Sequence, residues 1–193
     1  MLLPNLTNKK IVLASKSPRR QQLLKGLELD FEVRTKEVDE SFPRELFAQD
    51  IPIFLSKVKA EAFRSEMRED EIIITADTVV WINDHVMNKP ESRDEAIAMI
   101  EELSGTMHTV YTAVTMTSAD KQFSFCDEAK VYFVPLSKFE IEHYIDQYQP
   151  FDKAGAYGVQ ELIGYIAIEK MEGSYFTVMG LPVQKLYELL KKW

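Results

Sequence analysis

Hydrophobic positions along the chain change repeatedly between strand-like and helix-like spacing. Strands are predicted where short apolar runs occur, at residues 11–14, 31–34, 72–75, 79–82 and 163–168. Residues 109–117 and 122–133 alternate between apolar and polar with a period of two, and the polar segment 119–121 joins them, so they predict a β-hairpin. Strands that alternate with helices in this way predict an α/β fold, a mixed β-sheet flanked by helices.

The predicted helices begin after residues whose side chains can accept a hydrogen bond from the first helical turn. These caps and helices are Ser17 before 18–24, Asp50 before 52–66, Ser92 before a helix ending at Leu103, and Ser137 before a helix ending at Tyr148. Glu140 completes a capping box with Ser137, and Gly105 ends the third helix. A last amphipathic helix is predicted over 182–193.

Length and net charge limit the kind of protein this is. The 193 residues are expected to form a single domain, 1–193, which is long enough to bury a hydrophobic core. A net charge of −8 argues against a polymeric nucleic acid as partner, because phosphate backbones are bound by positively charged surfaces. Places where cations cluster in such an acidic chain are therefore candidate sites for binding phosphate groups.

Cysteine usage and hydropathy favour a cytoplasmic protein. Cys126 is the only cysteine, so no internal disulfide can form, as is usual in a reducing compartment. Residues 1–10 are too short for a signal peptide, and Pro4 and Asn5 interrupt them. No apolar run approaches the roughly 18 residues that a membrane span needs, so we expect no membrane partner.

Positive side chains gather where the first predicted strand gives way to the first helix. Backbone N–H groups at a helix N-terminus bind anions, and Lys16, Arg19 and Arg20 stand in the same turn. Cations oppose the positive end of the helix dipole, so their placement suggests that an anion binds there. The planar guanidinium suits phosphate oxygens. The alternative is a capped helix with solvated cations, and we favour the phosphate site.

Two carboxylates are candidates for chemistry. Asp77 interrupts an apolar strand, where a carboxylate is costly to bury unless it is paired or binds a metal. Its alternative role is a turn that links two strands, and we expect a break in the strand there. Glu40 lies in an acidic loop with Asp39, and such a loop is most often solvated.

Six ordered blocks of sequence resemble the Maf family of nucleoside triphosphate pyrophosphatases. The first is Leu-Ala-Ser-Lys-Ser-Pro-Arg-Arg at residues 13–20. The others follow at 76–78, 89–90, 103–108, 152–160 and 173–182. Together they span nearly the whole chain. The resemblance implies an elongated mixed sheet with two lobes and a cleft, and a homodimer.

The resemblance also implies a reaction and roles for residues. The reaction is hydrolysis between the α and β phosphates, with Mg²⁺ or Mn²⁺ as cofactor. Asp77 would accept a proton from water, and Glu40 would hold the cation with it, with Asp39 as an alternative ligand. Lys59 and Lys89 would be catalytic residues with Asp77 and would neutralise charge on the phosphates. The residues assigned to substrate binding in the same pocket are Ser15, Arg19, Arg20 and Lys153.

Arg20, Thr78 and Gln160 together resemble the branch of the family that acts on dTTP and UTP. Gln160 has donors and an acceptor, which suits the edge of a pyrimidine base. The alternatives are a 7-methyl-GTP pyrophosphatase and a nucleotide-binding regulator of septum formation. Two positions depart from the family pattern, Ala129 and Thr177, and either could alter the pocket wall.

Overall fold

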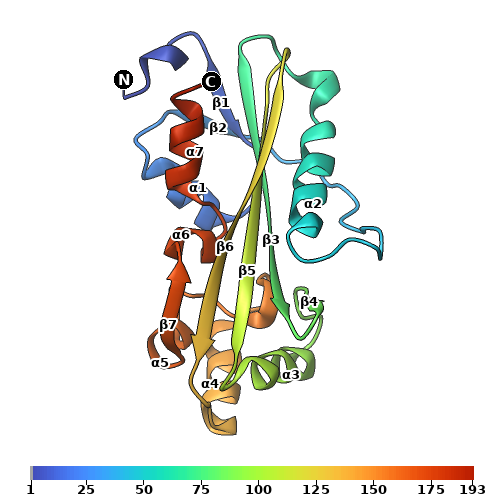
Figure 1. Cartoon of the computed structure of the whole chain (residues 1–193), viewed down its shortest axis with the longest axis vertical. Coiled ribbons are helices and arrows are strands. Elements are labelled where there is room, and N and C mark those ends of the chain that lie inside the picture. The colour runs from blue at the N-terminus through green and yellow to red at the C-terminus, as the bar shows by residue number, and fades with distance from the viewer. Residues whose placement is uncertain (1) are drawn as a thin grey trace. The chain divides into compact units, whose positions relative to one another are not determined.

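The computed structural model of this protein describes residues 2–193 and contains one mixed seven-stranded sheet. The strand order is β2 (Phe31–Val33), β1 (Lys10–Leu13), β3 (Glu71–Ile82), β5 (Met107–Thr117), β6 (Gln122–Phe133) and β7 (Ile168–Gly173), with β4 (His85–Met87) paired to β3. β1 runs parallel to β2 and β3, whereas β4 and β7 pair antiparallel with their neighbours (Figure 1). The predicted α/β fold with a mixed sheet is therefore confirmed.

Seven α-helices and three 3₁₀ turns surround the strands within residues 2–193. The helices are α1 (Pro18–Lys25), α2 (Asp50–Glu61), α3 (Arg93–Leu103), α4 (Lys138–Tyr148), α5 (Leu162–Ile166), α6 (Tyr175–Val178) and α7 (Val183–Leu190). The 3₁₀ turns are η1 (Pro4–Leu6), η2 (Arg64–Glu66) and η3 (Ala154–Ala156). None of these described helices is long and apolar enough to cross a membrane.

Side-chain caps fix several helix starts where the sequence predicts them. The hydroxyl of Ser17 accepts from the amide of Arg20, and that of Ser92 accepts from the amide of Glu95. Ser137 makes the full capping box at the start of α4. These predictions are confirmed because a cap depends on residues three apart in the chain.

The chain divides into two compact units. Unit 1 comprises the residues up to Asp77 together with Thr112–Asp127 and Gly180–Trp193. Unit 2 comprises Thr78–Tyr111 and Glu128–Met179. Strands β3, β5 and β6 contribute residues to both units.

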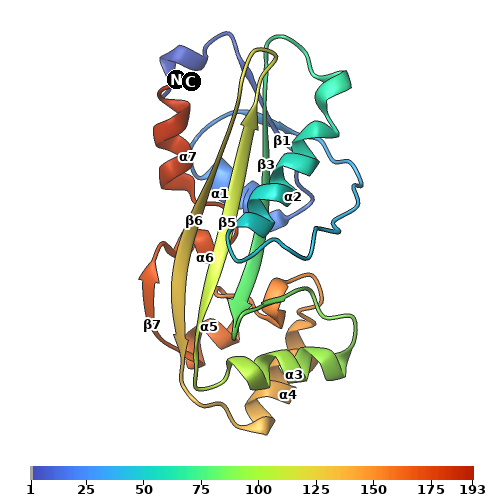
Figure 2. The same cartoon turned by 45° about the vertical axis from the view of Figure 1, so that its right-hand side comes forward.

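In unit 1, α2 covers one face of the sheet, and α1 and α7 lie on the other (Figures 1 and 2). Polar contacts tie α2 to the strands: Thr75 Oγ1 donates to the carbonyl of Ser56 at 2.7 Å, and the Ser56 hydroxyl lies 2.8 Å from that of Thr115. Alternate residues of a strand point to the same face. Asp77 therefore lies on the α2 face of β3 beside Thr75.

In unit 2, α3 packs beside α4 and also contacts η3 (Figure 2). Arg93 of α3 donates two hydrogen bonds to Asp146 of α4, at 2.7 and 2.9 Å. Asn83 and Asp84 both have positive φ, 47° and 62°, which a tight hairpin turn between β3 and β4 requires.

Three predictions about β3 and α2 are wrong. Asp77 does not break its strand, because β3 runs unbroken from Glu71 to Ile82 and the carboxylate is accommodated by a charged partner. Asp50 is not the cap of α2: it lies inside the first turn, after Gln49, where a negative charge still favours the helix dipole. That helix ends at Glu61, and residues up to Glu66 include only a 3₁₀ turn.

The predicted strand 163–168 is mostly the short helix α5. Ile163 is fully buried in it, and the chain turns so tightly that a side chain at Gly164 would collide with the carbonyl of Val159. A short apolar run does not by itself distinguish a buried helix from a strand. The strand of this region, β7, instead begins at Ile168 and is rich in charged residues.

Candidate functional site

One lysine and two carboxylates meet on the α2 face of β3. Lys59 Nζ, from α2, lies 2.5 Å from Asp77 Oδ1 and 2.9 Å from Glu40 Oε1. The helix and the strand therefore place Lys59 and Asp77, and the loop after β2 brings Glu40 to them. We call these three residues the acid–lysine cluster. Side-chain exposure is only 10% for Asp77 and 16% for Lys59, so their charges interact strongly.

Burial makes Asp77 more basic than an ordinary aspartate. Loss of hydration raises the pKa of Asp77, and the positive charges of Lys59 and Arg20 partly oppose that rise. A carboxylate with a raised pKa accepts a proton more readily than one in water. The cluster thus contains a buried base with a cation in contact.

Arg20 is anchored by backbone carbonyls. Its Nε donates to the carbonyl of Gly180 and its Nη1 to that of Ala76, both at 2.8 Å. Burial lowers the pKa of Arg20, whereas the negative charge of Asp77 raises it. Since Ala76 directly precedes Asp77, the hydrogen bond to Ala76 fixes the guanidinium close to Asp77 along β3. Sequence reasoning predicted Arg20 as a phosphate ligand but not this anchoring.

The rest of the predicted anion loop is only partly gathered at the cluster. Ser15 is buried, and its hydroxyl accepts from the amide of Ser17 at 3.2 Å. Arg19 is half-buried on the first turn of α1, and its charge lowers the pKa of Arg20. Lys16 instead is exposed and pairs with Glu37 at 3.1 Å.

Glu40, rather than Asp39, is the loop carboxylate that reaches the cluster. Both oxygens of Asp39 accept hydrogen bonds from Ser41, one from its amide and one from its hydroxyl, at 2.9 Å. These bonds lower the pKa of Asp39 and use its acceptors within the loop. The structure thus favours Glu40 over Asp39 as a ligand.

The two carboxylates fit a hard divalent cation. Residues 2–193 hold no group of three or more His, Cys, Asp or Glu side chains arranged for a metal. Glu40 and Asp77 nevertheless converge on one positive charge, the ammonium of Lys59. Two carboxylates completed by water and phosphate oxygens are a usual ligand set for Mg²⁺.

Unit 2 carries the remaining predicted residues. Thr78 follows Asp77 directly in β3 and is half-buried, and Lys89 is exposed in the link after β4. The carbonyl of Asn88 accepts from the amide of Gly155 at 3.1 Å, so the Lys89 link adjoins the segment 152–160. The Oε1 atom of Gln160 is buried without a hydrogen-bond partner in the described chain. Such an atom is costly unless a ligand completes it.

Lys153 is held by two carboxylates. Its ammonium lies 2.7 Å from Asp152 Oδ1 and 3.2 Å from Glu161 Oε1, and its side chain is 9% exposed. Sequence reasoning missed Glu161, which lies just after the family block. Gly155 has φ +69°, a conformation that favours glycine, and a side chain there would also press on Val80.

The buried His108 of the fourth family block has Tyr157 as its partner. Its Nε2 lies 2.7 Å from the Tyr157 hydroxyl, and both rings stack edge-on with Phe133. Burial lowers the pKa of His108 to about 3, so the imidazole is neutral at pH 7.

The two departures from the family pattern, Ala129 and Thr177, are both fully buried in unit 2.

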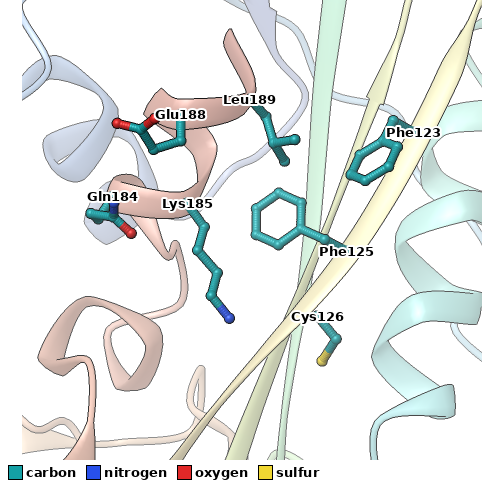
Figure 3. A pocket seen from close by; sticks show the side chains of 7 residues that line it. All are labelled: Phe123, Phe125, Cys126, Gln184, Lys185, Glu188 and Leu189. Carbon is teal, nitrogen blue, oxygen red and sulfur yellow. The ribbon is translucent and has the colours of Figure 1, made fainter. Parts of the chain in front are cut away.

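A pocket of about 280 Å³ on unit 1 lies apart from the predicted residues. Figure 3 shows its lining side chains, which come from β6 and α7: Phe123, Phe125, Cys126, Gln184, Lys185, Glu188 and Leu189. None of these seven is a predicted site residue. Lys185 pairs with Asp127 beside it. Cys126 is thus a partly exposed pocket residue within a mainly apolar wall.

Comparison with known proteins agrees with the six sequence blocks. The family model described as "Maf-like protein" matches residues 10–193. The dTTP/UTP pyrophosphatase of Parabacteroides distasonis is 51% identical over 191 residues, which cover 98% of this chain and 99% of that protein. The enzymes of the same name from Bacteroides thetaiotaomicron and Flavobacterium johnsoniae are 50% and 48% identical, covering 99% and 98% of this chain and 100% and 98% of their own. This chain belongs to the Maf-like protein family.

Proposed function

We propose that this protein is a nucleoside triphosphate pyrophosphatase that hydrolyses dTTP and UTP to the nucleoside monophosphate and pyrophosphate. The observation that carries the proposal is the acid–lysine cluster, a buried basic carboxylate with a cation in contact and an anchored arginine nearby. Full-length relatives about half identical to this chain bear the name of that activity.

Asp77 serves as the general base in this proposal. Its carboxylate accepts a proton from the water that attacks the substrate, and the desolvation that raises its pKa favours this transfer. Lys59 holds the carboxylate in place through its 2.5 Å contact. Positioning and charge stabilisation are the main contributions that a protein makes to such phosphate chemistry.

Positive groups neutralise the triphosphate. In unit 1 these are Arg19, Arg20 and Lys59, with the backbone N–H groups at the start of α1. Ser15 supports the loop that precedes this helix. In unit 2 we assign Lys89 and Lys153 the same role. Each cation reduces the repulsion between phosphate oxygens and the acidic chain.

Glu40 and Asp77 would hold Mg²⁺ or Mn²⁺. Such a cation supplies positive charge that stabilises phosphate oxygens during hydrolysis. Carboxylates and phosphate oxygens are the hard ligands that both ions prefer.

Gln160 and Thr78 are the proposed contacts to the nucleoside. The unpartnered Oε1 of Gln160 is an acceptor that suits the N3–H donor of uracil and thymine. Cytosine has no such donor at N3. This difference predicts discrimination in favour of UTP and dTTP over CTP.

A pyrophosphate-release screen tests the proposed function. Wild-type protein is incubated with dTTP, UTP, CTP and 7-methyl-GTP, with Mg²⁺ or Mn²⁺ and with or without chelator. We expect release from dTTP and UTP that the chelator abolishes. A marked preference for 7-methyl-GTP would place the chain in the other branch of the family. Nucleotide binding without release would indicate a regulatory protein.

The homodimer that the family resemblance implies and the cytoplasmic location expected from the composition remain predictions. Sedimentation equilibrium of the purified chain would measure the first, and cell fractionation the second.

A further inference from the structure

A chain of hydrogen bonds links α4 to the segment that carries Lys153 and Gln160. The amide of Gly158 donates to the Tyr144 hydroxyl at 2.9 Å, and that hydroxyl donates to Glu161 Oε2 at 2.5 Å. The other oxygen of Glu161, Oε1, forms an ion pair with the ammonium of Lys153 at 3.2 Å. We call these four residues, Tyr144, Lys153, Gly158 and Glu161, the Glu161 tether.

The Glu161 side chain is committed to this tether and not to its local helix. Glu161 stands at the cap position of α5, yet it makes no side-chain cap there. Both oxygens instead bind groups from residues 144 and 153. The carboxylate of Glu161 therefore does not serve as a helix cap but connects Tyr144 and Lys153.

The residues of the tether are buried or half-buried and fit closely. Tyr144 is fully buried, and the Glu161 side chain is 18% exposed. A Cβ at Gly158 would lie 2.7 Å from Cδ of Glu161, so only glycine lets the carboxylate approach its own loop this closely. Buried polar groups that satisfy one another hold a single geometry, and loss of one partner leaves the others costly.

We propose that Glu161 and Tyr144 are positioning residues that fix the 153–160 segment for nucleotide binding. One carboxylate oxygen, together with Asp152, holds the ammonium of Lys153. The other oxygen, through Tyr144, fixes the backbone at Gly158, two residues before Gln160. A single carboxylate thus places the contact to phosphate and the contact to the base together. This role in substrate placement rests on the proposed function.

The experiment compares Tyr144→Phe and Glu161→Gln with matched controls. Tyr144→Phe removes only the hydroxyl, and Glu161→Gln removes the charge but keeps an acceptor. The controls are Tyr148→Phe, an exposed tyrosine stacked on Tyr144 one helical turn later, and Glu142→Gln on the same helix. The readouts are amide hydrogen exchange of the peptide 153–161 and steady-state pyrophosphate release from UTP and CTP.

We expect amide exchange of peptide 153–161 to be roughly 10-fold faster in Tyr144→Phe, because the Gly158 amide loses its acceptor. Both variants should raise the KM for UTP by about 5- to 10-fold with little change in kcat, since Lys153 and Gln160 act in binding. The UTP/CTP ratio of kcat/KM should fall in Tyr144→Phe. In a Lys153→Met background, Glu161→Gln should no longer change KM, because the charge acts through Lys153.

Unchanged exchange in Tyr144→Phe overturns the tether, whatever the activity. Faster exchange with a KM for UTP equal to that of the controls overturns its role in nucleotide binding. A merely structural role would lower thermal stability and leave the UTP/CTP ratio unchanged. Wild-type protein that releases no pyrophosphate from UTP or dTTP overturns the proposed function and the role in substrate placement, while the exchange comparison still decides whether the tether exists.

Discussion

Lys59 donates a 2.5 Å hydrogen bond from α2 to Asp77 in the middle of β3. The bond explains how a strand of buried apolar residues continues through a carboxylate. It also keeps the ammonium of Lys59 in contact with the proposed general base. Removal of Lys59 leaves the buried Asp77 without an ammonium in contact, whereas removal of Asp77 leaves Lys59 paired with Glu40.

Lys59→Met should reduce turnover with dTTP and UTP by about 10²- to 10³-fold, because the variant loses a charge that stabilises both Asp77 and the phosphates. The matched control is Lys57→Met, an exposed lysine on the same helix. Steady-state pyrophosphate release measures both. Equal kcat values for the two variants would exclude Lys59 from the mechanism.

Glu71 should make folding stability depend on pH at the acid end. Burial alone would raise the pKa of Glu71, but hydrogen bonds from Arg34 and Arg68 lower it to about 2. Because the pKa of Glu71 is lower in the folded chain than the 4.5 of the unfolded chain, its charge stabilises the fold fully above pH 4.5. This contribution is lost as the pH falls toward 2. At pH 7 the contribution is roughly 3 kcal/mol.

Urea unfolding of wild type, Glu71→Gln and Glu69→Gln measures this contribution. Glu71→Gln should be less stable at pH 7, and the gap should narrow as pH falls from 4.5 toward 2. Glu69→Gln, exposed two residues earlier, should follow wild type. A gap between Glu71→Gln and wild type that is constant with pH would show that the charge of Glu71 is not responsible.

His108 should destabilise the fold at mildly acidic pH. Its folded pKa of about 3 lies below the ordinary 6.5, so the unfolded chain binds the proton first. Stability is therefore highest above pH 6.5 and falls as pH decreases toward 3. Between pH 6.5 and 5.5 the loss is about 1 kcal/mol.

Urea unfolding at these two pH values measures the effect in wild type, His108→Asn and His143→Asn. The loss should disappear in His108→Asn and persist in His143→Asn, whose histidine is exposed on α4. An undiminished loss in His108→Asn would assign the pH dependence to other groups.

Local signals in the sequence were sufficient for three of the four predicted caps and for most strands, whereas Asp50 lies inside α2 and does not cap it. Ser17, Ser92 and Ser137 each accept from the amide three positions later in the chain, so the pattern alone specifies them. The continuity of β3 could not be predicted in this way, because it depends on Lys59 of α2, which lies 18 residues from Asp77 in the chain. Sequence spacing does not reveal such a pair.

The region after α4 depends most on tertiary context. The run 163–168 fits a strand and a helix equally well, and packing of Ile163 decides for α5. Glu161 carries no motif of its own, and its role becomes visible only when Tyr144 and Lys153 are brought to it. Lys153 and Gln160, by contrast, could be selected from the family block that contains them.

Asp77→Asn tests the central claim most directly, because it keeps the shape of the side chain and removes its basicity. Pyrophosphate release from UTP should fall by about 10²- to 10⁴-fold. Affinity for a UTP analogue with a methylene bridge between the α and β phosphates should stay close to that of wild type. Asp84→Asn, in the exposed β3–β4 turn, is the control and should retain full activity. Pyrophosphate release by Asp77→Asn at the rate of that control would contradict the account.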